Sequence, residues 1–413
     1  MIEYGLNYVY QEIERPLPPI FASMTRRGIR IDVRRLTRLG ESLDSALATV
    51  LAGPLAGLNP GSPKQVAGVL YNDLELPILR RSKKTGGAST DEETLKMLQL
   101  RVGRIPFIES LLKYRELTKL KSTYVVGILE RIGSDSRLHP DWLQWGTSTG
   151  RISSRNPNGQ NIPASHIPGD YGSELRSCFI PADGFCFVVG DYSQIELRVM
   201  GVLAQEEVLL QAFREGRDVH AQVTQALGLA PELRWLGKNM NFGLGYGLQA
   251  DGLALKLSEE AEGGRVVTKA EAQRYINLYW SRMPNLAKWV EDTKDFLRGF
   301  GYVETLFGRR QYIALTGNRG RDAALLREAV NMPVQGTAGD ILKRMMKLLH
   351  KQLVHLGGHI LLTVHDEFVN EVPEKEAGEF AEWVAAKAAG MENIGVPIEM
   401  VVGVGGSWME AKK

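Results

Sequence analysis

The chain has 413 residues, of which 44% are hydrophobic and 24% charged, and its formal net charge is +2. This length predicts two or more domains or subdomains, and no apolar run is long enough to cross a bilayer. Two cysteines, Cys178 and Cys186, are too few for a disulfide framework or a zinc site and favour a reducing cytoplasm. Met1 is not followed by the pattern of a secretory leader. Because a net charge of +2 does not by itself indicate a nucleic-acid partner, evidence for one must come from local clusters of charge.

Residues 1–57 are predicted to be rich in helix, with a short β segment at residues 29–32 that pattern alone assigns to packing. Residues 58–135 are predicted to form an extended helical module. Ser62, followed by proline and by glutamine at the third position, indicates a helix start, and the segment Thr90-Asp91-Glu92-Glu93 caps the next helix.

Two basic tracts lie in this helical module: the glycine-bearing loop over residues 80–87, with Lys83 and Lys84, and the helix over residues 113–121. A solvated helix face is the commoner meaning of such charge. A clamp on a phosphate backbone is the alternative, and two tracts in one module favour it slightly.

Residues 146–163 are dense in hydroxyl and amide side chains and also carry Arg151 and Arg155. The pattern predicts neither a helix nor a simple strand. A polar surface loop is the ordinary interpretation. The length of the segment and its many hydrogen-bonding groups favour contacts with phosphates and base edges.

The apolar run at residues 185–189 predicts a buried strand, and Asp191 stands where that strand ends. Ser193 and Glu196 fit a capping box, which predicts that a helix follows at once. Oxygen ligands converge at such a strand end, so Asp191 is a candidate ligand for a hard cation. One carboxylate holds a metal weakly, and a second must come from elsewhere in the chain.

Residues 206–325 are predicted to be mainly helical. Arg234, Lys238 and Phe242 recur every four residues, with Tyr246 next, so they share one helix face. The cations suit a polyphosphate and the rings suit stacking on a base. An amphipathic helix with aromatic core contacts is the alternative.

Residues 327–350 are predicted to be helical, and residues 360–372 to form a hairpin with His365-Asp366-Glu367 at its turn. A last short strand is expected within residues 397–408. Only folding can pair Asp191 with Asp366. Two carboxylates on adjacent strand ends would suit two Mg²⁺ ions about 3.5–4 Å apart, the arrangement used for in-line phosphoryl displacement.

Several separated motifs, in order, resemble the polymerase portion of the family A DNA polymerases, the bacterial DNA polymerase I family, without nuclease domains. The matching segments are Thr149-Gly150-Arg151 through Asn161 (primer–template segment), Asp191 to Arg198 (first palm motif), Arg234 to Gly247 (fingers helix), Gln335 to Ala338 (template-contacting helix) and Val364 to Glu367 (last palm motif), with Lys121 to Tyr124 similar to the end of the thumb.

The resemblance implies an α+β, right-hand polymerase fold with an antiparallel-sheet palm, a helical thumb and helical fingers. The implied segments are 1–57 (N-terminal helical segment joining the palm), 58–135 (thumb), 136–205 (first part of the palm), 206–325 (fingers) and 326–413 (second part of the palm).

The resemblance implies a template-directed DNA polymerase that adds deoxynucleotides to a primer 3′-hydroxyl with two Mg²⁺ ions, for which Mn²⁺ can substitute. The implied partners are primer-template DNA and deoxynucleoside triphosphates, with no membrane. The chain is expected to act as a monomer in the cytoplasm of a bacterium or a virus-infected cell, with an organelle as an open alternative. No proofreading exonuclease domain is expected in this chain.

Residue roles follow from the same resemblance. Asp191 and Asp366 are the implied metal ligands, joined by the Tyr192 carbonyl and supported by Glu367. The implied nucleotide-binding residues are Arg234, Lys238 and His220 on the triphosphate, with Lys238 as proton donor, Phe242 stacked on the nucleotide, Tyr246 at the templating base and Glu196 as the gate against a ribose 2′-hydroxyl. The implied DNA-binding residues are Lys121, Arg151, Asn158, Gln160, Asn161, Arg327, Asn331, Gln335 and His365.

Two rival functions stay in view. A single-subunit RNA polymerase has a related palm, but Glu196 and Phe242 argue against it. A catalytically dead DNA-binding protein would have lost a carboxylate or Lys238, and this chain retains them.

Three positions depart from the family pattern. Gly237 and Gly245 each cost a helix interior about 0.8–1.0 kcal/mol relative to alanine, which predicts a more flexible fingers helix. Asp322 stands beside Arg321 where a second arginine is common, which predicts a weaker template contact.

Overall fold

The computed structural model describes residues 6–82, 85–163, 170–261, 265–391 and 393–412. The chain divides into two compact units. The first takes in Met1–Val33, Arg131–Gln249 and Arg274–Lys413, and the second Arg34–Glu130 and Ala250–Gln273. Among the described residues, no helix has both the length and the apolar character needed to span a membrane.

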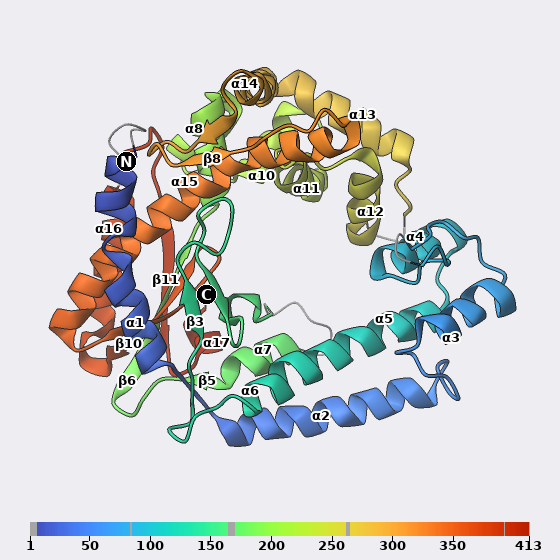
Figure 1. The fold of residues 1–413 in the computed structure, drawn as a ribbon, viewed down its shortest axis with the longest axis horizontal. Coiled ribbons are helices and arrows are strands. Elements are labelled where there is room, and N and C mark those ends of the chain that lie inside the picture. The colour runs from blue at the N-terminus through green and yellow to red at the C-terminus, as the bar shows by residue number, and fades with distance from the viewer. Residues whose placement is uncertain (1–5, 83–84, 164–169, 262–264, 392, 413) are drawn as a thin grey trace. The chain divides into compact units, whose positions relative to one another are not determined.

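The first unit is organised around a four-stranded antiparallel sheet in the order β11-β6-β10-β9. Its strands are β6 (Phe185–Tyr192), β9 (His359–Val364), β10 (Glu367–Pro373) and β11 (Met400–Gly405). β6 lies between β10 and β11, so residues 187–189 of its apolar run are buried as predicted, whereas Phe185 and Cys186 are half-buried. Helix α16 (Ala377–Met391) packs on β6 and β11, whereas α1 (Leu17–Arg27) and α15 (Arg319–Leu356) pack on β9, as Figure 1 shows.

The predicted acidic hairpin is confirmed. β9 ends at Val364 and β10 begins at Glu367, so His365 and Asp366 form the turn. His365 has a φ of 56°, the left-handed conformation that tight hairpin turns require. Glu367 pairs in register with Asp191 of β6, and the Tyr192 amide donates to the Asp366 carbonyl at 3.2 Å. The register therefore brings Asp191 and Asp366 to the same end of the sheet.

Three smaller sheets complete the strands of the first unit: β2-β1-β5, β3-β4 and β7-β8. The remaining elements of this unit are η1 (Val9–Glu14), β1 (Ile29–Ile31), β2 (Arg137–Leu138), β3 (Asp141–Leu143), β4 (Ser153–Arg155), η4 (Gly159–Asn161), α7 (Tyr171–Ser177), β5 (Phe179–Ile180), α8 (Ile195–Ala204), α9 (Glu207–Arg214), α10 (Val219–Ala226), η5 (Pro231–Leu233), α11 (Arg234–Leu244), α14 (Pro284–Phe300), β7 (Tyr302–Glu304), β8 (Arg310–Tyr312), η7 (Glu374–Glu376) and α17 (Trp408–Ala411).

The second unit is helical. Its elements are α2 (Val33–Ala52), α3 (Pro63–Gly68), η2 (Val69–Asp73), α4 (Glu92–Val102), α5 (Pro106–Lys119), η3 (Leu120–Val126), α6 (Gly127–Leu129) and α12 (Ala250–Glu260), and α13 (Lys269–Arg282) begins in this unit and ends in the first. Both predicted helix starts are confirmed, because Ser62 accepts from the Gln65 amide at 3.4 Å and Asp91 from the Thr94 amide at 2.8 Å. α2 belongs to this unit, although the sequence grouped it with residues 1–57. The assignment of segments to palm, thumb and fingers stays a prediction.

A buried ionic cluster ties η1 to the long helix α15. Lys343 Nζ lies 2.6 Å from Glu14 Oε1, and Arg309 Nη2 lies 2.7 Å from Asp340 Oδ1. Arg309 also pairs with Glu14, so two carboxylates meet two cations. The Lys343 and Asp340 side chains have no exposed surface. Such a closed cluster fixes how these elements meet, because a partner left alone there would be a buried charge.

Candidate active site

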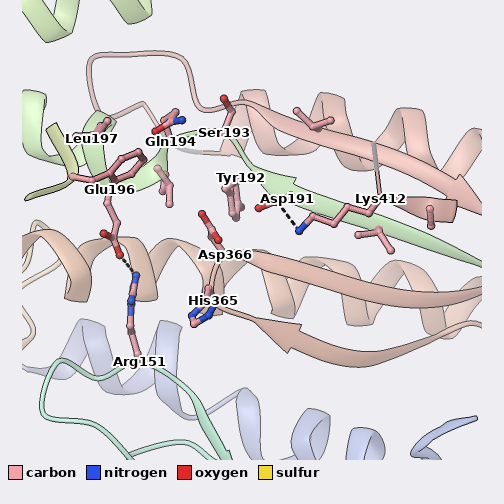
Figure 2. A pocket seen from close by; sticks show the side chains of 15 residues that line it. Arg151, Asp191, Tyr192, Ser193, Gln194, Glu196, Leu197, His365, Asp366 and Lys412 are labelled. Carbon is pink, nitrogen blue, oxygen red and sulfur yellow. Dashed lines mark hydrogen bonds and ion pairs between the residues drawn. The ribbon is translucent and has the colours of Figure 1, made fainter. Parts of the chain in front are cut away.

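Two carboxylates form the centre of the site. Asp191 lies near the end of β6 and Asp366 in the neighbouring turn, and both line a cavity of about 530 Å³. Figure 2 shows their side chains at this cavity, with Lys412 reaching Asp191 and Arg151 reaching Glu196. The predicted pairing of Asp191 with Asp366 is therefore present in the fold.

The two carboxylates repel each other when both are ionised. Burial, together with the charge of the nearby Asp191, raises the pKa of Asp366 to about 6, although Arg151 acts in the opposite direction. A raised pKa means that the ionised form is held at a cost, which a bound cation would remove. Oxygen ligands of this kind suit a hard divalent ion.

The site fits a divalent ion that takes only part of its ligands from side chains. Within the described residues, no cluster of three or more His, Cys, Asp or Glu side chains is arranged to hold a metal. Asp191 and Asp366 would therefore share the ion with backbone oxygens, such as the Tyr192 carbonyl, and with a ligand or water. Mg²⁺ commonly binds in this way, through one or two carboxylates plus substrate phosphates.

Glu367 has other partners than the sequence implied. Its side chain is buried, and its carboxylate accepts from Trp408 Nε1 at 2.7 Å and from Lys412 Nζ at 2.5 Å. Arg176 lies 3.8 Å away. Any support that Glu367 gives to a metal is therefore indirect, through the segment that carries Trp408 and Lys412.

The capping-box interpretation of Glu196 is wrong. Gln194, with a φ of 54°, precedes α8, and no side chain caps the helix. The Glu196 carboxylate instead accepts hydrogen bonds from the Arg151 guanidinium and the Tyr246 hydroxyl. Burial raises the pKa of Tyr246, so its phenol stays protonated and donates. A cation and a phenol from distant segments are stronger partners than a nearby amide.

The predicted stripe on α11 lies largely at the surface. Arg234, Lys238 and Phe242 are exposed, whereas the intervening residues are mostly buried. Arg234 donates to Asp218, and Phe242 lines the cavity of Asp191 and Asp366. Tyr246 follows the end of the helix at Leu244 and lies by Glu196 instead. Packing into the core, the alternative interpretation, does not explain the exposed members.

His220 is buried behind this stripe. Burial, with the positive charges of Arg234 and Lys238, lowers its pKa to about 4, although Asp218 acts in the opposite direction. Its Nδ1 lies 3.2 Å from Asn241 Nδ2, and its ring lies 5.4 Å from that of Phe242. The imidazole is therefore neutral near pH 7 and offers hydrogen bonding rather than charge.

The residues expected to bind DNA fall into groups. Arg151, Asn158, Gln160 and His365 line a second cavity of about 260 Å³, which also reaches Asp366. Asn158 caps the turn η4 by accepting from the Gln160 amide. The other predicted DNA-binding residues of the first unit line neither cavity. Asn161 lies in η4, and Arg327, Asn331 and Gln335 lie on α15.

The basic tracts of the second unit are partly neutralised within it. Arg115 donates to the Thr90 carbonyl, Arg80 pairs with Glu93, and Lys121 pairs with Asp44. Lys83 and Lys84 of the basic loop lie outside the described residues. A role for Lys121 in DNA binding stays a prediction.

The two unusual glycines have a packing explanation. A Cβ at Gly237 would lie 2.7 Å from the His220 carbonyl oxygen, and one at Gly245 would lie 2.7 Å from the sulfur of Met200. These glycines let α11 approach α10 and α8 closely, so they need not loosen the helix. Asp322 accepts from the amides of Thr316 and Gly317, which stabilises the turn before α15.

Sequence reasoning missed Lys412. It lines the main cavity and touches two carboxylates, but it lies outside every motif. A lysine beyond a short helix carries no local signal of a site. The pairing of β11 with β6 and the buried Trp408 of α17 bring it there.

Comparisons with known proteins agree with this geometry. The profile of DNA polymerase family A matches residues 35–410. The chain is 40% identical over 423 residues to a thermostable DNA polymerase I of Thermus filiformis and 38% identical over 424 residues to that of Thermus aquaticus. These alignments cover 99% and 100% of this chain and 49% of each relative.

A solved structure of the POL domain of Pol1 from M. smegmatis, in complex with DNA primer-template and dNTP, is similar with a TM-score of 0.90 and 34% identity. The match covers 100% of this chain and 73% of that one. The chain belongs to DNA polymerase family A, and its predicted α+β polymerase fold class is confirmed. It spans about half the length of the curated relatives that it matches.

Proposed function

We propose that this chain is a template-directed DNA polymerase that adds deoxynucleotides to a primer 3′-hydroxyl by a two-metal-ion mechanism. The observation that carries the proposal is the pairing of Asp191 with Asp366 at one cavity, where burial and mutual repulsion favour a divalent cation. Membership of DNA polymerase family A supports it. So does the similar POL domain, which was solved with primer-template and dNTP.

Asp191 and Asp366 would hold the metal, together with the Tyr192 carbonyl. Bound Mg²⁺ would lower the pKa of the attacking hydroxyl and neutralise charge on the phosphates. The carboxylates must be ionised for this, and the pKa of about 6 at Asp366 leaves most of them ionised near neutral pH.

The stripe on α11 would bind the incoming nucleotide. Lys238 is exposed and free to meet a triphosphate, and Arg234 would exchange Asp218 for phosphate oxygens. Lys238 would donate a proton to the departing pyrophosphate. Phe242, on the cavity wall, would stack on the nucleotide, and neutral His220 would donate a hydrogen bond.

Glu196 would act as the sugar gate. Arg151 and Tyr246 fix its carboxylate at the cavity wall, so the side chain cannot swing away without losing a charged and a neutral partner. A ribose 2′-hydroxyl at this place would clash with a side chain that is fixed in position. Tyr246 would also border the templating base.

The second cavity would receive the primer terminus and the template. Arg151, His365, Asn158 and Gln160 supply donors and acceptors there. Asn161, Arg327, Asn331 and Gln335 would extend these contacts along the duplex, and Lys121 of the helical unit would meet its phosphate backbone.

Primer extension tests the proposal. The chain is incubated with a primer-template and Mg²⁺, with deoxynucleotides or ribonucleotides, and with or without a chelator. Metal-dependent extension with deoxynucleotides is expected. Preferred use of ribonucleotides would favour an RNA polymerase, and tight primer-template binding without extension would favour a binding protein. Either result overturns the proposal.

A further inference from the structure

Lys412 lies between two carboxylates of the site. Its Nζ is 2.5 Å from Glu367 Oε2 and 3.4 Å from Asp191 Oδ2. Figure 2 shows the lysine side chain pointing at Asp191. The lysine also lines the cavity that contains Asp366. Among the ion pairs of the described residues, none reaches Asp366.

Buried side chains fix the position of the Lys412 ammonium group. Lys412 directly follows α17, whose Trp408 is fully buried and donates to Glu367 Oε1 at 2.7 Å. The Arg176 guanidinium stacks on the Trp408 ring at 4.4 Å, and Phe179 packs edge-on against it at 5.3 Å. One carboxylate oxygen of Glu367 therefore accepts a hydrogen bond from Trp408, and the other accepts one from Lys412. The lysine is held at Asp191 by an anchored helix rather than by a chance surface contact.

The same arrangement places a cation where a divalent ion would bind. Asp191 belongs to the proposed metal pair, and Lys412 contacts it from the cavity wall. A positive charge this close lowers the affinity of the carboxylates for a second cation, because the two cations repel each other. It also keeps Asp191 in place when no metal is bound.

We propose that Lys412 is a positioning residue that acts through Asp191: it occupies the carboxylate as a resident cation and sets the divalent-ion affinity of the site. This inference rests on the proposed metal pair of Asp191 and Asp366. Among the described residues, Lys412 forms ion pairs with the carboxylates of Asp191 and Glu367. Its contact with Glu367 keeps that carboxylate turned away, so Glu367 contributes to metal binding only by holding the lysine.

Binding of Mn²⁺ to the protein without DNA or nucleotide tests the inference, with free Mn²⁺ followed by electron paramagnetic resonance. Lys412→Met is expected to lower the dissociation constant by roughly three- to tenfold, as expected for a half-exposed neighbouring charge. Lys412→Arg keeps the charge and is expected to stay within about twofold of the unchanged protein. Lys375→Met is the matched control, because Lys375 is 82% exposed and pairs only with Glu376 among the described ion pairs.

Two further variants separate this inference from the function on which it rests. Asp191→Asn is expected to weaken Mn²⁺ binding strongly, and unchanged binding would refute the metal pair itself. In the Asp191→Asn background, Lys412→Met is expected to add nothing. If it tightened binding equally there, or failed to tighten binding in the unchanged background, the inference about Lys412 would be wrong while the metal pair stood.

Thermal melting shows whether each variant is folded. Where Lys412→Met does not fold, Lys412→Gln replaces it, because the amide can still donate to Glu367 without a full charge. Lys412→Gln is expected to increase the affinity for Mn²⁺, as Lys412→Met does. An unchanged dissociation constant in folded Lys412→Gln overturns the inference.

Discussion

Two acidic clusters of the first unit show opposite charge arrangements. In the cluster of Glu14 and Asp340, Lys343 and Arg309 supply two cations for two carboxylates. Burial alone would raise the pKa of Glu14, but Lys343 and Arg309 lower it. Burial keeps the pKa of the deeper Asp340 raised, although Arg309 and Lys343 act in the opposite direction. In the cluster of Asp191 and Asp366, burial and repulsion instead raise the pKa of Asp366 to about 6.

The difference separates a structural role from a functional one. A closed, balanced cluster holds elements together and has no capacity for another ion. In the pair at the cavity, Lys412 reaches Asp191, but no ion pair among the described residues reaches Asp366. This unbalanced pair retains unfavourable electrostatic energy that a ligand can relieve, and perturbed groups of this kind concentrate at functional sites. Both clusters join residues that are distant in sequence, so the charge balance and the cavity distinguish them, not the residue types.

The largest expected effect comes from removing one member of the unbalanced pair. Asp191→Ala should reduce primer extension by at least about a thousandfold, because metal ions contribute several kcal/mol to such reactions. Primer-template affinity, measured by fluorescence anisotropy, should change little. Asp183→Ala is the control, since that side chain is 95% exposed and pairs with Arg30. Extension that survives in Asp191→Ala would remove Asp191 from the metal site.

Breaking the balanced cluster should affect stability instead. Lys343→Met leaves Glu14 and Asp340 with one cation and should cost about 3–5 kcal/mol in the free energy of unfolding. Lys347→Met is the control, because its pair with Glu12 is exposed and should contribute less than about 1 kcal/mol. Denaturant unfolding measures both. Equal effects of the two variants would contradict the structural role.

Asp366→Asn should increase stability while it abolishes extension. The folded-state pKa of Asp366 is about 6 against an ordinary 3.8. The folded state therefore holds more protons between these values, and the contribution of Asp366 to stability falls as the pH rises through that window. In chelator at pH 8, the variant should gain about 2 kcal/mol, after allowance for solvent screening.

The pH dependence of this gain is the check. Denaturant unfolding at about pH 4 should show almost none of it, because the unchanged protein is then protonated at Asp366. Asp295→Asn, at a 73% exposed side chain, is the control. A gain that does not depend on pH would show that the acidic pair is not repulsive.

Glu196→Ala should have the smallest effect on stability, since Glu196 and Arg151 are both partly exposed. The variant should lower discrimination against ribonucleotides by roughly tenfold to a hundredfold, the range expected for a small steric contact. Comparison of single-nucleotide incorporation with deoxy- and ribonucleotides measures it. Glu196→Gln keeps the size of the side chain and should retain most of the discrimination. Unchanged discrimination in Glu196→Ala would place the gate elsewhere.

Local pattern predicted much of the secondary structure. The apolar run before Asp191, the acidic hairpin and the caps at Ser62 and Asp91 are all present, because they depend on residues a few positions apart. The four-residue spacing on α11 also appears, with an exposed stripe. The two strand ends suggested a pairing of the distant carboxylates, and the family resemblance supplied their role as metal ligands.

Local pattern failed where a side chain has partners from distant segments. The helix-cap interpretation of Glu196 missed Arg151 and Tyr246. The pattern also missed the close approach of α10 to Gly237, and the predicted flexibility of α11 stays a prediction. In both cases a tertiary contact is stronger than the local preference. A local rule cannot detect such a contact.

The sequence by itself determined the helices and strands, the acidic and basic motifs and the family of this chain. Tertiary structure alone decided which carboxylates are balanced by cations. The register of β6 with β10 brings Asp191 to Asp366, and the anchored helix α17 brings Lys412 to Asp191. Charge interactions depend on distance and burial, and local sequence patterns predict neither quantity for residues that are far apart in the chain.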